Sequence, residues 1–393
     1  MQVSDVIETL QSLGDDNWAI YHRARQMIAE GHDVIELAIG EPDVPTPDYL
    51  VDAAVKALKA GRTGYSPGAG EQTLRTVLAA RYSERSGRRI GSDQILCFPG
   101  TQTALYAVMR AIAGDGDEVL VGDPMYATYE SVVAASGARV TPVPLSVENR
   151  FRLSAADVEA RITPASKVLF LNTPHNPTGA VLTVQDLKEL GELAQQHGLW
   201  LLVDEVYEEL VFRGVPFRSP LTKSDLSDRV IVVSSISKSH AAPGFRSGWC
   251  VGPAEFCAKL LPLSEAMLFG NQPFIADATA KAIAEPSPIA QGMCDRFAAR
   301  ADRLASVLHD QTRLYVHTPD AGMFALLDVS ATGLDGDTFS RDLLVRGGVA
   351  VMPGSSFGKS LKNWVRVSLT APDKVFDAAC HRIADHVKRL DAG

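Results

Sequence analysis

The chain has 393 residues and a formal net charge of −9 at pH 7, with 46% hydrophobic and 22% charged residues. These values are typical of a globular protein, and the length predicts two or perhaps three domains with a sizeable core. The acidic balance argues against a nucleic-acid partner or an anionic membrane surface. No run of about 18 apolar residues is present, so we also expect no membrane span.

The five cysteines are scattered along the chain, and no pair has the spacing of metal ligands. The first residues lack a basic segment followed by an apolar one, so we expect no signal peptide. The sequence therefore predicts reduced, mostly buried thiols in a cytoplasmic protein without a metal site.

Amphipathic runs over residues 5–31 predict two helical segments, the second from Trp18 to Ala29. From about 95 to 250, apolar strands alternate with helices, which predicts a mostly parallel sheet covered on both faces. The C-terminal part mixes strands and helices, as in a smaller α+β domain. The fold class is therefore α/β, with a large domain at 46–280 and a small domain formed by 1–45 and 281–393.

A single lysine leaves the apolar strand 230–233 among hydroxyls and small residues. Ser235 and Arg246 suit a phosphate group, because one supplies a hydroxyl and the other a planar fork of donors. Lys238, held near cationic and polar groups, can lose its proton and act as a nucleophilic amine. A solvated loop lysine is the structural alternative.

The stretch from Ser234 to Trp249 resembles the pyridoxal-phosphate lysine motif of the class I aminotransferases of fold type I, with the pattern Ser-x-Ser-Lys and then Gly-x-Arg-x-Gly-Trp. The resemblance covers most of the chain. It implies a mostly parallel seven-stranded sheet, pyridoxal 5'-phosphate as the cofactor, and Lys238 as the catalytic residue that holds it as a Schiff base.

The resemblance places further cofactor contacts on loops. Gly100, Thr101 and Gln102 stand where a strand turns into a helix, and free amides at a helix N-terminus suit an anion. Tyr126 would stack on the cofactor ring, although buried aromatics often only pack. Tyr65 would reach the cofactor phosphate of a neighbouring subunit, which implies a homodimer with shared active sites.

Two strand ends carry the remaining polar contacts. The octapeptide 172–179 is close to the family's signature loop, in which Asn176 would contact the phenolic oxygen of the cofactor and the substrate. Asp204 ends an apolar strand and would keep the pyridine nitrogen protonated. Tyr207, three residues later, would donate to the phenolic oxygen.

The substrate carboxylate needs a cationic partner. Arg366 lies inside an apolar strand, where an unpaired guanidinium is costly, so an internal salt bridge is one interpretation. The resemblance implies instead a two-point grip on the α-carboxylate. Gly40 follows a short strand and is either a turn residue or part of the wall of the substrate site.

We therefore expect transfer of the amino group of an L-amino acid to a 2-oxo acid, pyruvate or 2-oxoglutarate, by a ping-pong mechanism. A pyridoxal-dependent C–S β-lyase shares most of these residues and stays open. A regulator built on this fold needs a DNA-binding domain for which no segment is spare, and a nicotinamide oxidoreductase needs a glycine fingerprint that is absent.

The choice of amino donor is less determined. The chain resembles bacterial aspartate, aromatic and arginine–pyruvate transaminases, and the arginine–pyruvate type is nearest over the whole length, including Trp18. Asp15 and Asp16 could face a cationic side chain, although exposed acids at a helix start are the simpler interpretation.

Overall fold

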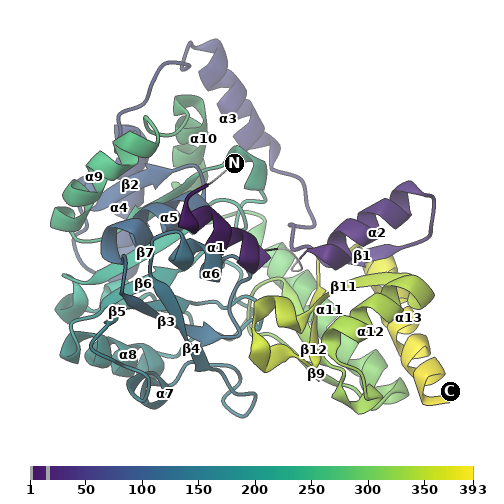
Figure 1. Ribbon diagram of the computed structural model, residues 1–393. Helices are drawn as coiled ribbons and strands as arrows, with labels where there is room; N and C mark the ends of the chain where they lie inside the picture. Colours follow the sequence, from purple (N-terminus) through teal and green to yellow (C-terminus); the bar gives the residue numbers. More distant parts are fainter. Residues whose placement is uncertain (1–2, 15–17, 393) are drawn as a thin grey trace.

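The computed structural model describes residues 3–14 and 18–392. Within these ranges, the strands form a seven-stranded sheet, called the large sheet below, and a five-stranded one, called the small sheet. Figure 1 shows the two sheets side by side, each with its own helices. The seven-stranded, mostly parallel sheet predicted for an α/β protein is confirmed.

The large sheet has the order β2-β8-β7-β6-β5-β3-β4, and β8 runs antiparallel to both of its neighbours. Its strands are β2 (Ile95–Phe98), β3 (Glu118–Asp123), β4 (Arg139–Pro144), β5 (Ser166–Asn172), β6 (Trp200–Asp204), β7 (Val230–Ser235) and β8 (Gly248–Val251). Because the other strands are parallel, the carboxyl ends of β3, β5, β6 and β7 meet at one edge of the sheet.

Helices cover both faces of this sheet, so its central strands are apolar on both sides. Leu202 and Ile231 pack with α5, α6 and α9, whereas Leu201 and Val232 pack with α4 and α8 on the opposite face. The helices of this half are α3 (Asp48–Lys59), α4 (Gln72–Ser86), α5 (Thr101–Ile112), α6 (Tyr129–Ala134), α7 (Ala155–Glu159), α8 (Val184–Gln196), α9 (Ala254–Met267) and α10 (Pro273–Ile283).

The small sheet has the order β1-β11-β12-β10-β9 and joins distant parts of the sequence. Its first strand pairs in parallel with β11, with Ile35 opposite Val349. The strands are β1 (Ile35–Leu37), β9 (Tyr315–His317), β10 (Phe324–Asp328), β11 (Val349–Pro353) and β12 (Trp364–Ser368). The remaining helices are α1 (Asp5–Gly14), α2 (Ala19–Ala29), α11 (Ala290–Gln311), α12 (Gly336–Asp342) and α13 (Asp373–Ala392).

The N-terminal segment is divided between the two halves. Helix α1 packs on α6 beside the large sheet, whereas α2 packs on β11 of the small sheet. The apolar side chains of β10, β11 and β12 form a second core with α11 and α13. The division into a large domain at 46–280 and a small domain formed by 1–45 and 281–393 stays a prediction.

Helix α12 changes its form at its C-terminal end. The α-helical turns end at Asp342, and Leu343–Gly347 continue as a short π-helix that closes on Gly348 with φ +65°. Across the described ranges, no helix combines the length and apolarity that crossing a membrane requires.

Candidate active site

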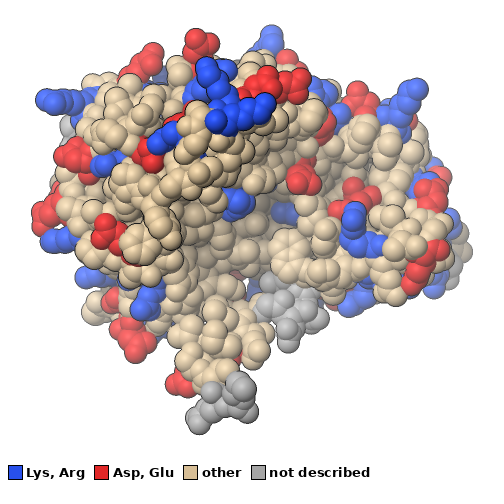
Figure 2. Space-filling view, turned by 90° about the horizontal axis from the view of Figure 1, so that it is seen from above, with Lys and Arg blue, Asp and Glu red and all other residues tan. Residues whose placement is uncertain are grey.

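The loops after the carboxyl ends of the large-sheet strands enclose a cavity of about 230 Å³. Figure 2 shows the hollow in this face of the molecule, with basic side chains inside it. Strands β10 and β12 of the small sheet close the opposite wall with Phe324 and Arg366. A ligand in this cavity therefore contacts both halves of the chain.

Lys238 lies three residues beyond β7, and its side chain is partly buried in the cavity. Its Nζ donates a hydrogen bond of 2.8 Å to the carbonyl oxygen of Gly40. Burial, and next the positive charge of Arg366, lower the pKa of Lys238 to about 8. A substantial fraction of this amine is therefore neutral near pH 8.

An anion cradle lies at the N-terminus of α5. Gly100 has φ +90°, and a Cβ there would stand 2.3 Å from Nη2 of Arg246. A Cβ at Gly248 would meet the Gly100 carbonyl carbon at 2.6 Å and the Thr101 nitrogen at 2.7 Å. The hydroxyl of Thr101 is buried and, within the described residues, has no hydrogen-bond partner. Free amides, a free hydroxyl and a guanidinium fit a phosphate group.

Two further contacts complete this cradle. Ser235, at the end of β7, lines the cavity and accepts a hydrogen bond from the Ser237 N–H at 3.3 Å. Arg246 is held in place by its donation to the carbonyls of Pro243 at 2.9 Å and Pro99 at 3.2 Å. Gln102, in the first turn of α5, also lines the cavity and accepts from Thr128 at 3.1 Å.

Asp204 ends β6 and places its carboxylate in the wall of the cavity. It accepts hydrogen bonds from the Tyr129 hydroxyl at 2.9 Å and the Val206 N–H at 3.0 Å. Burial raises the pKa of Asp204 to about 6, against the effect of these two donors and of Lys238. The group is therefore ionised at neutral pH, where it can hold a protonated nitrogen.

Arg366 comes from the middle of β12 and is buried. Its Nη2 donates to the Ala38 carbonyl at 2.7 Å and its Nη1 to Oδ1 of Asn176 at 3.1 Å. No ion pair holds it among the described residues, and its Nε has no partner there. Burial lowers its pKa to about 10, so the guanidinium is still charged at neutral pH and free to bind an anion.

Aromatic rings flank this guanidinium. Its central carbon lies 3.8 Å from the ring centroid of Phe324 and 4.4 Å from that of Phe357, so the cation contacts both rings. The rings fix the orientation of the donors of Arg366 without neutralising its charge. Such a group suits a carboxylate that lies in the same plane.

Three more side chains converge on the cavity. The backbone N–H of Asn176 donates to Oδ1 of Asn172 at 2.8 Å, in the loop where the bonds before Pro174 and Pro177 are cis. Tyr207 and Tyr126 also line the cavity, and burial raises the pKa of both phenols. Both are therefore hydrogen-bond donors at neutral pH.

The sequence-predicted residues come together with one exception. Those that line the cavity are Gly40, Thr101, Gln102, Tyr126, Asn176, Asp204, Tyr207, Ser235, Lys238, Arg246 and Arg366, and Gly100 borders it through its contact with Arg246. Tyr65 lies outside, 92% exposed, with its ring 5.8 Å from that of Phe269. Asp15 and Asp16, considered for a cationic side chain, lie outside the described residues, whereas Trp18 lines the cavity.

Sequence reasoning missed the supporting side chains. Tyr129, which bonds Asp204, lies in the first turn of a helix and has the pattern of a core aromatic. Phe324 belongs to the apolar strand β10, whereas Phe357 ends a short turn of small and polar residues shortly before β12. A buried, unpaired arginine was the one available signal that aromatic partners were needed.

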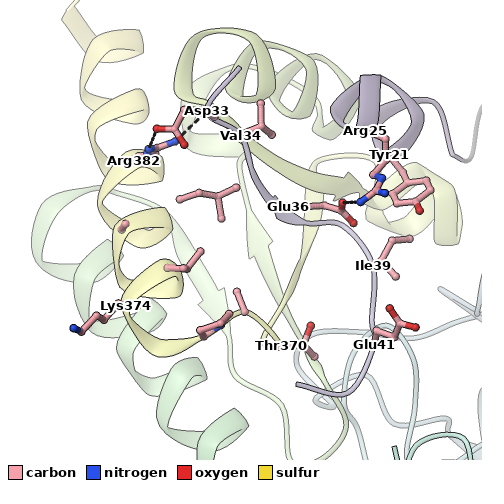
Figure 3. Close-up of a pocket in the computed structure, with 15 residues that line it drawn as sticks. Tyr21, Arg25, Asp33, Val34, Glu36, Ile39, Glu41, Thr370, Lys374 and Arg382 are labelled. Carbon is pink, nitrogen blue, oxygen red and sulfur yellow. Dashed lines mark hydrogen bonds and ion pairs between the residues drawn. The ribbon is translucent and has the colours of Figure 1, made fainter. Parts of the chain in front are cut away.

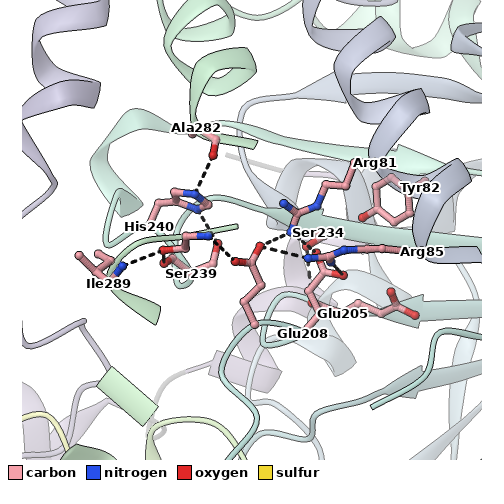
Figure 4. A network of polar contacts seen from close by, with 12 residues as sticks. Arg81, Tyr82, Arg85, Glu205, Glu208, Ser234, Ser239, His240, Ala282 and Ile289 are labelled. Carbon is pink, nitrogen blue, oxygen red and sulfur yellow. Dashed lines mark hydrogen bonds and ion pairs between the residues drawn. The ribbon is translucent and has the colours of Figure 1, made fainter. Parts of the chain in front are cut away.

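A polar network lies next to the loop that follows Lys238 (Figure 4). His240, fully buried, contacts the Ala282 carbonyl at 3.0 Å and the Ser239 hydroxyl at 2.9 Å through its two ring nitrogens. Arg85 pairs with Glu208 at 2.6 Å, and Arg81 pairs with the neighbouring Glu209. This network ties the lysine loop to α4, α10 and the turn after β6.

Comparisons with known proteins point to one family. A family model described as aminotransferase class I and II matches residues 32–383. The chain is 41% identical to the arginine–pyruvate transaminase of Pseudomonas aeruginosa over 98% of both chains, and 34% identical to an aromatic-amino-acid aminotransferase of Thermococcus litoralis over 89% of this chain and 91% of the relative. A Thermus thermophilus aspartate aminotransferase solved with maleate has a TM-score of 0.92 at 29% identity, covering 98% of this chain and 100% of that one.

The match over most of the chain confirms the resemblance drawn from the lysine motif. The buried donors of the cradle and the cavity fit the phosphate and ring of the cofactor that this family uses. The chain belongs to the class I and II aminotransferases and is a pyridoxal 5'-phosphate-dependent aminotransferase.

Proposed function

We propose that the enzyme transfers the amino group of L-arginine to pyruvate. The observation that carries the proposal is an amine with a lowered pKa, Lys238, in one cavity with an unpaired guanidinium, Arg366, and a phosphate cradle. The donor and acceptor are suggested by the 41% identity to an arginine–pyruvate transaminase over 98% of both chains. Aspartate or aromatic donors are the alternatives, because other relatives carry those names.

In this proposal, the residues around the cavity divide the binding of the cofactor. The phosphate contacts are Gly100, Thr101, Gln102, Ser235 and Arg246, together with Tyr65 of a second copy. Asp204 holds the pyridine nitrogen, Tyr126 stacks on the ring, and Asn176 and Tyr207 contact the phenolic oxygen. When bound, pyridoxal phosphate supplies an electron sink that stabilises negative charge on the α carbon of the substrate.

Lys238 and Arg366 act on the substrate itself. Arg366 binds the α-carboxylate through donors that the two phenylalanine rings keep in plane. The backbone of Gly40 and the amide of Asn176 form the adjacent wall. The amine of Lys238 accepts the α-proton and returns it at the end of the transfer, which its lowered pKa favours near pH 8.

We also propose that the enzyme is a cytoplasmic homodimer. Val51, Val55 and Leu58 form an exposed apolar stripe on α3, whose other face packs on α10. The exposed rings of Tyr65 and Phe269 extend the apolar surface beyond this helix. All five cysteines, which lie in the described part of the chain, are unpaired and buried, as in a reducing compartment.

The test uses the cofactor-loaded enzyme, one amino acid at a time, without an acceptor. A transaminase releases about one 2-oxo acid per active site from its preferred donor and then stops, because the transfer is ping-pong. We expect this burst with arginine, and continued turnover once pyruvate is added. Lys238→Ala should abolish both, and an intact burst in that variant would contradict the lysine's role.

Other outcomes correct the proposal in defined ways. A burst with aspartate or phenylalanine and little with arginine would reassign the donor within the family. Continued release of pyruvate and ammonia from a cysteine thioether, without any acceptor, would indicate a C–S β-lyase activity instead.

A further inference from the structure

The segment that follows β1 passes the two substrate-facing side chains in a fixed order. The Ala38 carbonyl accepts a hydrogen bond from Arg366 at 2.7 Å, and the Gly40 carbonyl accepts one from Lys238 at 2.8 Å. Glu41 is the next residue. In chain order, this segment therefore contacts the guanidinium of Arg366, then the amine of Lys238, and then supplies its own carboxylate at Glu41.

An amino-acid substrate presents its groups in the same order. With the α-carboxylate on Arg366 and the α carbon beside Lys238, as the proposed function requires, the side chain continues towards Glu41. The backbone from Ala38 to Glu41 spans at most about 11 Å. A long side chain such as that of arginine can cover this range, whereas a short one cannot.

A second cavity of about 760 Å³ opens at this point (Figure 3). Ile39 lines both this cavity and the catalytic one, and Glu41 lies in the wall of the second. Figure 3 shows Ile39 and Glu41 on the same stretch of chain. A substrate side chain that passes Ile39 therefore enters a space large enough for a guanidinium and its water.

The charges of this second cavity leave one carboxylate available. Glu36 lies 3.9 Å from Arg25, and Asp33 pairs with Arg382. Glu41 is exposed and, among the described residues, has no hydrogen bond or ion pair. Lys374, the other charged wall residue without an ion pair among the described residues, lies across the cavity on α13. The negative charge of Glu41 also reaches Lys238, whose pKa it raises against the larger effects of burial and Arg366.

We propose that Glu41 binds the cationic end of the donor side chain, a guanidinium or ammonium group, and so determines the preference for basic amino acids. The proposal rests on the proposed function, because it needs the α-carboxylate on Arg366. Gly40 supports it, since a Cβ there would lie 2.1 Å from Phe324, which fixes the path of the segment beside the cavity.

The first test measures binding without turnover. 5-Guanidinopentanoate has the carboxylate and guanidinium of arginine but lacks the amino group. Hexanoate keeps the carboxylate but has an uncharged hydrocarbon end in place of the guanidinium. We expect calorimetric titration of the cofactor-loaded enzyme to give tighter binding of the guanidino compound. Glu41→Gln should weaken that binding about tenfold and leave hexanoate unchanged. Glu36→Gln, whose carboxylate already faces Arg25, is the matched control and should change neither.

Turnover gives the second readout. The ratio of kcat/KM for arginine to kcat/KM for alanine should fall about tenfold in Glu41→Gln and stay constant in Glu36→Gln. Equal losses for arginine and alanine would mean that Glu41 acts only on Lys238, and would overturn the proposal. Equal binding of the two probes by the unmodified enzyme would overturn it as well. If arginine is not a donor at all, the proposed function fails, but the binding comparison still decides the role of Glu41.

Discussion

Arg366 is a buried cation without an anionic partner among the described residues, and this makes it the most informative side chain of the site. It contacts two aromatic rings and donates hydrogen bonds to Ala38 and Asn176, yet it has no acidic partner among the described residues. A protein rarely keeps a buried, unpaired positive charge unless a bound anion balances it. The substrate carboxylate is the ligand that the neighbouring amine of Lys238 requires.

Arg366→Lys should lower kcat/KM for the amino donor about a hundredfold, mainly through a higher KM. An ammonium group keeps the charge but loses the planar pair of donors and the stacking between rings. Steady-state kinetics of the half-reaction would measure the effect. Arg81→Lys is the control, because Arg81 is also buried but pairs with Glu209 and does not line the cavity. Similar KM values in both variants would contradict the assignment.

The amine of Lys238 should titrate well below an ordinary lysine. Its pKa of about 8 means that it is mostly protonated below pH 8 and mostly neutral above, so its reactivity rises as pH increases through that value. Competitive labelling of the cofactor-free protein with acetic anhydride would give the midpoint. Arg366→Gln removes a neighbouring positive charge and should move the midpoint upward. A midpoint near 10 for Lys238 in the unmodified protein, as for an ordinary lysine, would contradict this account of the site.

The sequence predicts the reactive side chains of the site better than the side chains that hold them in place. Lys238 and Asp204 each follow an apolar strand, so their place at the carboxyl edge of a parallel sheet follows from strand order alone. Tyr129 and Phe357 have no such local signal, because Tyr129 contacts Asp204 far along the chain and Phe357 ends a short turn without an apolar pattern. The roles themselves stay predictions until variants are measured.

The junction of β2 and α5 depends on a glycine that no other residue can replace without strain. Gly100 has φ +90° and contacts Arg246 where a side chain would begin. Gly248 is equally confined, against the backbone of Gly100 and Thr101. Strand, turn and helix N-terminus together therefore hold the backbone of the cradle in one conformation.

Gly100→Ala should weaken cofactor binding at least tenfold, because the new methyl group displaces the Arg246 guanidinium. Gly61→Ala is the matched control: Gly61 has φ +79°, but a Cβ there has no neighbour within 4 Å. Each variant should lose about 1 kcal/mol of stability from the strained backbone. Fluorescence titration of the cofactor-free proteins would compare affinities, and equal affinities would show that the contact with Arg246 is unimportant.

Two short strands, β8 and β9, are not predicted by the sequence pattern. The antiparallel strand β8 is only four residues long and follows a loop rich in small residues, so its direction depends on the path of residues 236–247. The three-residue strand β9 lies beyond a long helix, and it has an exposed tyrosine at its start. Long apolar strands such as β5 and β7 are predicted by their composition, whereas these short ones are set by their neighbours.

The exposed apolar surface around α3 predicts a dimer with exchanged residues. Tyr65→Ala and Lys238→Ala should each be nearly inactive alone, the first because a second copy loses its phosphate contact. Unfolding the two together and refolding them as a mixture should restore about a quarter of the native activity, since half of the random dimers carry one intact site. Tyr65→Phe, mixed in the same way, tests the hydroxyl. No recovery would contradict a shared active site.

The pairing of Ile35 with Val349 has a consequence for how the enzyme matures. The segment from Ala38 to Gly40, beside the catalytic cavity, is translated long before β11, the strand that pairs with β1 and holds it in place. Arg366 is translated later still. The large sheet can assemble first, as domains generally do during synthesis, yet the nascent chain has no complete substrate pocket until β12 has been translated. A chain that terminates before β12 therefore carries the lysine without the arginine that would orient its substrate.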